Sequence, residues 1–228
     1  LILVTGATGS GKSTTTAAMI DYRASQMDGH IVTIEDPIEF LFEHKRSLVT
    51  QREVGMDTLS FKEALRNSLR QAPNVIYIGE LRDAETVEFA LHSAETGHLV
   101  LSTLHSTNAS QSIERVLNFF PRNYHSQVSI QLSYNLRAII CQRLIPSESG
   151  TRIPVLEILI NSAFAQEVIQ KGELGQLRQL MENGKQEGMQ TFDLHLKELV
   201  EKKLISEEKA MTFADSPSDL RLKLRGFV

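Results

Sequence analysis

The chain has 228 residues, 41% of them hydrophobic, and a formal net charge of −4 at pH 7. This length allows one sizeable core plus a smaller appended unit, and the acidic balance provides no overall basic footprint for nucleic acid. The single cysteine, Cys141, excludes a disulfide framework and a multi-cysteine metal site, and no apolar run approaches the roughly 20 residues of a membrane-spanning helix.

The first predicted element is a strand over residues 1–5, which leads into a glycine-rich loop and a helix over residues 13–26. Because the chain starts inside this strand, we expect a preceding part of the protein to be missing. The loop has the P-loop spacing, G-x-x-x-x-G-K-[ST], in the strand–loop–helix context that the motif requires. The predicted nucleotide-binding residues are Gly6, Ala7, Thr8, Gly9, Ser10, Gly11, Lys12, Ser13 and Thr14.

The residue types of this loop suit phosphate binding. Its glycines let the backbone approach phosphates closely, and the N–H groups at the helix start bind them. Lys12 is expected to reach the β- and γ-phosphates, and the Ser13 hydroxyl to ligate Mg²⁺. A chance match of this spacing is expected in about one chain in a hundred of this length. The sequence therefore predicts a site for a nucleoside triphosphate, ATP, with Mg²⁺.

Short β-rich runs then alternate with segments of helical spacing. Strands are predicted over residues 30–35, 75–79, 99–103, 138–144 and 153–160. Helical spacing is found from Phe61 to Leu69 and from Val87 to Ala94, and the pair Ser60 and Glu63 has the capping-box pattern that marks the start of the first of these helices. This alternation predicts an α/β fold with a mainly parallel sheet covered by helices on both faces.

Beyond residue 160 the pattern changes to helices alone. They are expected over residues 161–172, 173–184, 191–203 and 206–214, and they are short, polar-faced and separated by glycines. We therefore predict an ATPase core over residues 1–160 and a small C-terminal helical domain over residues 161–228.

Acidic residues follow two of the predicted strands. Residues 34–40 read Ile-Glu-Asp-Pro-Ile-Glu-Phe, and Glu80 follows the strand over residues 75–79. Ligands of open α/β sheets bind at the carboxyl ends of the strands. One acid of the first group is thus placed to orient or deprotonate the water that attacks the γ-phosphate, and Glu80 to contact Mg²⁺, partly through water. Solvated surface carboxylates are the commoner alternative.

Two histidines, His98 and His105, flank the strand predicted over residues 99–103. We expect both at the tip that faces the γ-phosphate, where either one could sense it. A structural histidine is the commoner alternative, and a zinc site lacks further ligands.

These motifs in this order resemble the secretion-superfamily ATPases, whose boxes are a P-loop, an aspartate box, an atypical second acidic motif and a histidine box. The resemblance covers residues 1 to about 224 and is carried by the phrases IEDPIEF, QREVG, ALRNSLRQAPN, IGELRD and ETGHLVLSTLHSTNA. It implies a RecA-like P-loop NTPase core. By position it makes Glu39 the catalytic base, Glu80 the acidic-motif glutamate, and His98 with His105 the histidine-box pair.

Within the superfamily the chain resembles the type IV pilus retraction ATPases of the PilT/PilU family. Assembly and type II secretion ATPases carry a four-cysteine zinc insertion where residues 146–152 form a short linker here. Residues 164–170 read FAQEVIQ where PilT has AIRNLIR, so that both arginines are replaced by glutamines. This departure, with residues 71–73 and the tail 215–220, resembles the accessory PilU-type members.

The resemblance also implies partners and a location. Family members are hexameric rings whose N-terminal PAS-like domain packs on the neighbouring core. They are cytoplasmic and act at the inner-membrane base of the pilus machine. The implied activity is ATP-driven pilus retraction and twitching motility, together with an inner-membrane platform protein and a paralogous retraction ATPase, and without nucleic acid.

A neighbour's arginine can complete such a site and raise its rate by ~10³–10⁵. The arginines in or near the family boxes are Arg52, Arg66, Arg70, Arg82 and Arg115. We rank Arg70 and Arg82 first because they bracket the strand before Glu80. Surface ion pairs of little consequence are the alternative.

Three other functions are left open by the residues themselves. A RecA-like nucleic-acid translocase predicts basic pore loops and stimulation by single-stranded DNA, and the acidic balance weighs against it. A small-molecule kinase needs an arginine-rich lid and an acceptor-binding segment, which we do not find. A weakly hydrolysing, nucleotide-gated subunit of a mixed motor assembly is kept open by the altered stretch over residues 164–170.

Overall fold

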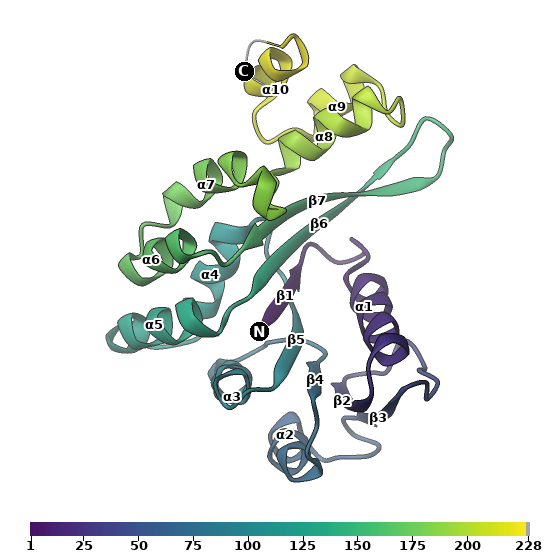
Figure 1. Cartoon of the computed structure of the whole chain (residues 1–228), viewed down its shortest axis with the longest axis vertical. Helices are drawn as coiled ribbons and strands as arrows, with labels where there is room; N and C mark the ends of the chain where they lie inside the picture. The colour runs from purple at the N-terminus through teal and green to yellow at the C-terminus, as the bar shows by residue number, and fades with distance from the viewer. Residues whose placement is uncertain (227–228) are drawn as a thin grey trace.

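A single seven-stranded sheet organises the chain (Figure 1). The computed structural model describes residues 1–226, and no helix within them is long and apolar enough to cross a bilayer. The strands are β1 (Ile2–Thr5), β2 (Gly29–Glu35), β3 (Ser47–Glu53), β4 (Val75–Ile78), β5 (Leu99–Leu104), β6 (Ala138–Pro146) and β7 (Arg152–Ile160). The α-helices are α1 (Lys12–Gln26), α2 (Phe61–Ser68), α3 (Ala84–Glu95), α4 (Ala109–Asn118), α5 (His125–Asn135), α6 (Ala163–Lys171), α7 (Leu177–Asn183), α8 (Phe192–Glu201), α9 (Glu207–Phe213) and α10 (Pro217–Leu224).

The strand order is β3-β2-β4-β5-β1-β6-β7. All neighbouring pairs are parallel except β6 and β7, which form an antiparallel hairpin. The predicted α/β fold with a mainly parallel sheet is confirmed. Because β1, β2, β4 and β5 run in one direction, their carboxyl ends meet at one edge of the sheet, where ligands of such folds bind.

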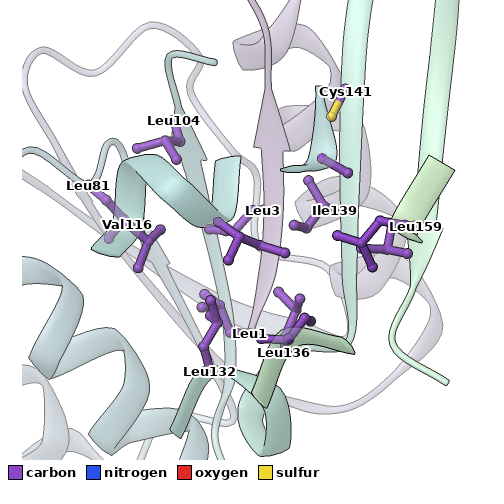
Figure 2. Close-up of a cluster of buried hydrophobic side chains, with 14 of the residues drawn as sticks. Leu1, Leu3, Leu81, Leu104, Val116, Leu132, Leu136, Ile139, Cys141 and Leu159 are labelled. Atoms are coloured by element: carbon purple, nitrogen blue, oxygen red, sulfur yellow. The ribbon is translucent and has the colours of Figure 1, made fainter. Parts of the chain in front are cut away.

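Helices cover the two faces of the sheet unequally. Helix α1 packs Ile20 and Ala24 against the face that presents Ile31, Val75 and Leu101. Helices α2 to α5 cover the opposite face, where a larger apolar cluster includes residues of β1, β5, β6 and β7 (Figure 2). Strand β1, which leads into the P-loop, is thus covered on both faces of the sheet, and this packing holds the start of the loop in place.

The C-terminal helices α6 to α9 lie along the hairpin of β6 and β7 (Figure 1). The four helices expected beyond residue 160 are present, and α10, which begins with Pro217, was not expected. Buried side chains of this segment, including Val168, Leu177 and Phe192, belong to the same apolar cluster as the sheet. The division into two domains at residue 160 stays a prediction.

Strand β3 was not predicted. It lies at the edge of the sheet, where only Ser47 and Val49 are buried, so its sequence, SLVTQRE, lacks the apolar character of an inner strand. The β-branched residues Val49 and Thr50 were the available signal. Helix α2, by contrast, starts where its cap predicted, since the Ser60 hydroxyl accepts from the Glu63 N–H at 3.2 Å.

Polar contacts attach the C-terminal segment to the hairpin. The Arg143 guanidinium of β6 binds Asp215 Oδ1 at 2.7 Å and stacks 3.8 Å from the ring centre of Phe192. The backbones of Ile158 in β7 and Gln190 also pair. The hairpin is therefore in contact with both the core and the final helices.

A buried carboxylate joins β7 to helix α4. Glu157 is 4% exposed, and its Oε1 accepts from the Ala109 N–H at 2.8 Å, at the start of that helix. Burial raises the pKa of Glu157 to about 7, against an ordinary value of 4.5. In this interval the folded protein holds a proton that the unfolded chain releases, so the carboxyl makes the free energy of unfolding fall as pH rises from about 4.5 to about 7.

We expect Glu157→Gln to flatten the pH dependence of stability. The glutamine oxygen can still accept from Ala109, but it does not titrate, so the fall in the free energy of unfolding between pH 5 and 8 should shrink by about 3 kcal/mol, the linkage value of such a shift. Denaturant unfolding at several pH values measures this. The exposed carboxylate variant Glu167→Gln is the control, and identical slopes for Glu157→Gln and the wild type would contradict the prediction.

Candidate nucleotide-binding site

The glycine-rich loop links the carboxyl end of β1 to helix α1. Gly9 and Gly11 have φ values of 76° and 88°, in the left-handed region that favours glycine, and Gly11 is the N-cap of α1. The loop therefore points the first N–H groups of the helix into the space above the sheet edge. This is the geometry expected of a phosphate-binding loop.

Lys12 lies within this loop. It is 8% exposed, and its ammonium donates to the carbonyl oxygens of Gly6 and Ala7, each at 3.0 Å. Burial lowers the pKa of Lys12, and the negative charges of Glu80 and Glu39 act in the opposite direction. Both predicted acids thus line the same cavity as Lys12, near enough to raise its pKa against the effect of burial.

A residue of β6 holds the loop from outside. Gln142 is 4% exposed, its amide donates to the Ser10 carbonyl at 2.6 Å, and its amide oxygen accepts from the Thr15 hydroxyl at 2.7 Å. Two loop glycines lie against the same residue: a Cβ at Gly6 would lie 2.4 Å from the Gln142 carbonyl oxygen, and a Cβ at Gly11 2.7 Å from its amide nitrogen. The loop conformation therefore depends on β6 as well as on its own sequence.

A cavity of about 500 Å³ opens between the loop and the strand ends. Residues of the loop, of the carboxyl ends of β2, β4 and β5, and of the hairpin line it. Among them are Lys12, Ser13, Glu35, Asp36, Glu39, Tyr77, Glu80, Arg82, His105, Leu144 and Arg152. The sequence did not single out Tyr77 of β4, or Leu144 and Arg152 of the β6–β7 hairpin, as site residues.

Charged side chains at this edge form a connected group. Arg82 binds Asp36 Oδ2 at 2.8 Å and lies 3.5 Å from Glu80 Oε2, and His105 Nε2 lies 3.4 Å from Glu80 Oε1. The Arg82 guanidinium also lies over the Phe61 ring, 5.3 Å from its centre. Glu80 is therefore flanked by two groups that can carry positive charge.

Two of the predicted site residues, His98 and Arg70, lie away from the cavity. His98 and His105 flank the six-residue strand β5 at its opposite ends, about 23 Å apart at 3.3 Å per residue. The expectation that both face one tip is wrong: His105 lines the cavity, and His98 Nδ1 pairs with the Ser93 carbonyl at 3.1 Å. Arg70 precedes β4, also at the far edge, and does not line the cavity of its own chain.

The oxygen ligands suit Mg²⁺. Ser13 and Glu80 line the same cavity, and hydroxyl and carboxylate oxygens are hard ligands of the kind that Mg²⁺ takes. Within the described residues, no group of three or more His, Cys, Asp or Glu side chains is placed to hold a metal by itself.

Comparison with known proteins gives consistent matches over nearly the whole chain. The family model described as type II/IV secretion system protein matches residues 1–210. The type IV pilus ATPase PilU of Pseudomonas aeruginosa is 51% identical over 99% of this chain and 59% of its own length. The type IV pilus retraction ATPase PilT of the same organism is 48% identical over 96% of this chain and 64% of its own length.

A solved structure agrees with these sequence matches. The crystal structure of the pilus retraction motor PilT with bound ADP superposes with a TM-score of 0.89 at 50% identity, over 96% of this chain and 62% of that one. The chain thus spans about three fifths of the length of the proteins it matches.

Proposed function

The chain belongs to the type II/IV secretion system protein family, and on that premise we propose that it is the ATPase core of a motor that retracts type IV pili and drives twitching motility. The observation that carries the proposal is that Glu39 and Glu80 line one cavity with the P-loop lysine. The similarity to PilU and to ADP-bound PilT supports it.

The P-loop is the proposed phosphate site. Its N–H groups and the Lys12 ammonium bind the β- and γ-phosphates, in place of the carbonyl contacts that Lys12 makes here. Ser13 and Glu80 are the residues that would hold Mg²⁺, with Glu80 acting partly through water. When bound, the ion would neutralise charge on the phosphate oxygens.

Glu39 is the proposed general base. It is exposed on the loop after β2 and lines the cavity, where it can take a proton from the attacking water. Arg82 orients Glu80 and Asp36 and supplies positive charge from within the same chain. His105, beside Glu80, is the proposed sensor of the phosphate. His98 and Arg70 have no proposed role at their own chain's nucleotide, and Arg70 stays a candidate for a neighbour's site.

The assembly we propose is a hexameric ring, cytoplasmic and peripheral at the inner-membrane base of the pilus machine. Its partners are an inner-membrane platform protein and a paralogous retraction ATPase. An accessory, PilU-type role is supported by helix α6, in which the side chain of Gln170 donates to the Ser133 hydroxyl of α5 at 3.0 Å, where PilT-type members have an arginine. The same helix supports the second candidate, a weakly hydrolysing subunit of a mixed ring.

Steady-state ATP turnover of the protein, alone and with a PilT-like ATPase, tests this function. We expect turnover that requires Mg²⁺, rises when the paralogue is added, and does not respond to single-stranded DNA. Size analysis with ATP should show hexamers. Turnover that single-stranded DNA stimulates would instead indicate a nucleic-acid translocase, and turnover seen only in the mixture would indicate the weakly hydrolysing subunit.

A further inference from the structure

The loop that carries Glu39 has no regular secondary structure. Residues 36–46, between β2 and β3, form neither helix nor strand, and Glu39 itself is exposed. A general base must nevertheless be held near its working position, because a displacement of about 1 Å can cost 10²-fold in rate. The side chains that hold this loop are therefore functionally important.

Gln51 of β3 binds the loop on one side of Glu39. Its amide nitrogen donates to the Phe40 carbonyl at 2.8 Å, and its amide oxygen accepts from the Phe42 N–H at 2.9 Å. The same nitrogen also donates to Glu35 Oε1 at 3.2 Å, at the end of β2. One amide thus joins the loop to two strands.

Glu53 binds the loop on the other side. Its Oε2 accepts from the Ile38 N–H at 2.9 Å, directly before Glu39. Gln51 and Glu53 are two residues apart on one strand, so their side chains lie on the same face of the sheet. Their backbones are fixed by the parallel pairing of Gln51 with Thr33 and of Glu53 with Glu35.

We propose that Gln51 and Glu53 are positioning residues for the Glu39 carboxylate, because together they bind the backbone groups immediately before and after it. This inference rests on the proposed function, in which Glu39 is the base. The edge strand β3 thereby acts on catalysis through the loop, without touching the nucleotide.

Turnover should depend on this clamp more than nucleotide binding does, although Phe40 and Phe42, which Gln51 binds, line the same cavity. Among the described residues, the hydrogen bonds of the Gln51 and Glu53 side chains go to β2 and to the 36–46 loop, and none goes to the P-loop. Loss of the clamp is therefore expected to lower kcat by a larger factor than it raises KM for ATP.

The test compares variants of β3 in the protein. Gln51→Leu removes all three hydrogen bonds at similar size, Glu53→Leu removes the acceptor for Ile38, and Glu53→Gln keeps an oxygen acceptor. Thr50→Val is the matched control. Thr50 lies on β3 with Gln51 and Glu53, but its hydroxyl pairs with His30 Nε2 of β2 at 2.9 Å and not with the loop. We measure kcat, KM, affinity for a fluorescent ADP analogue and thermal stability.

We expect kcat to fall about ten- to a hundredfold in Gln51→Leu and Glu53→Leu, with a smaller change in KM and in analogue affinity. Glu53→Gln should recover most of the rate, and Thr50→Val should match the wild type. In a Glu39→Gln background, Gln51→Leu should cause no further loss, because the group it positions is gone.

Two results would overturn the proposal separately from the function. One is a kcat within twofold of wild type in both leucine variants while Glu39→Gln is inactive. The other is an equal loss in Glu53→Gln and Glu53→Leu, because it would show that the hydrogen-bond acceptor for Ile38 does not set the rate. This comparison remains decisive if Gln51→Leu does not fold. If Glu39→Gln itself keeps full turnover, the assigned base is wrong, and the positioning role fails with it.

Discussion

Glu39→Gln is expected to lower ATP turnover by about 10²–10⁴-fold, the range supplied by a positioned general base. The substitution keeps the size of the side chain and removes its ability to take a proton from water. Glu39 lines the cavity, but it is not part of the P-loop and makes no hydrogen bond to Lys12. Nucleotide binding should therefore persist. Single-turnover hydrolysis and equilibrium binding of an ADP analogue separate the two quantities.

Glu43→Gln is the control for this prediction. Glu43 is exposed in the same loop and is not among the residues that line the cavity. The control should retain wild-type turnover. Unchanged turnover in Glu39→Gln would show that another group accepts the proton.

Gly6→Ala is expected to destabilise the fold by about 3 kcal/mol, within the range of backbone strain and steric overlap. Gly6 has a φ of 153°, and an added Cβ would meet the Gln142 carbonyl and the Ser10 hydroxyl, each at 2.4 Å. Relief of this overlap moves either β6 or the loop. We therefore also expect at least about tenfold weaker nucleotide binding. Equilibrium nucleotide binding measures the affinity, and denaturant unfolding without nucleotide measures the stability.

Gly9→Ala is the matched comparison for stability. Gly9 also has a positive φ, 76°, but no atom lies within 4 Å of the position its Cβ would take. The cost should then be the conformational one alone, about 1–2 kcal/mol. Equal losses in the two variants would mean that contact with Gln142 does not restrict the loop.

The features that local sequence determines were predicted correctly. The P-loop depends on glycines, a lysine and a hydroxyl within eight residues, and the structure has it between β1 and α1 as expected. The inner strands are apolar because both of their faces are covered, so their positions were clear from composition. Glu39, Glu80 and His105 line one cavity because parallel strands bring their carboxyl ends to one edge. Arg82, which we ranked as an arginine for a neighbour's site, lines the cavity of its own chain.

The features that depend on distant contacts were missed or misplaced. The role of Gln142 comes from a residue 132 positions away, Ser10, and the only local signal was an amide within an apolar strand. His98 was placed wrongly because its distance from His105 along the chain was not converted into the length of an extended strand. Strand β3 was missed because an edge strand does not need apolar residues on both faces.

The hairpin of β6 and β7 gives the fold a mechanical consequence. Gln142 hydrogen-bonds to the P-loop. Arg143, the next residue, pairs with Asp215 and stacks on Phe192 of the C-terminal segment. Neighbouring side chains on a strand point to opposite faces, so these two sets of contacts lie on opposite faces of β6, one peptide bond apart. Any displacement of β6 at this point would therefore shift both the glycine-rich loop and the residues that Arg143 contacts in the C-terminal segment.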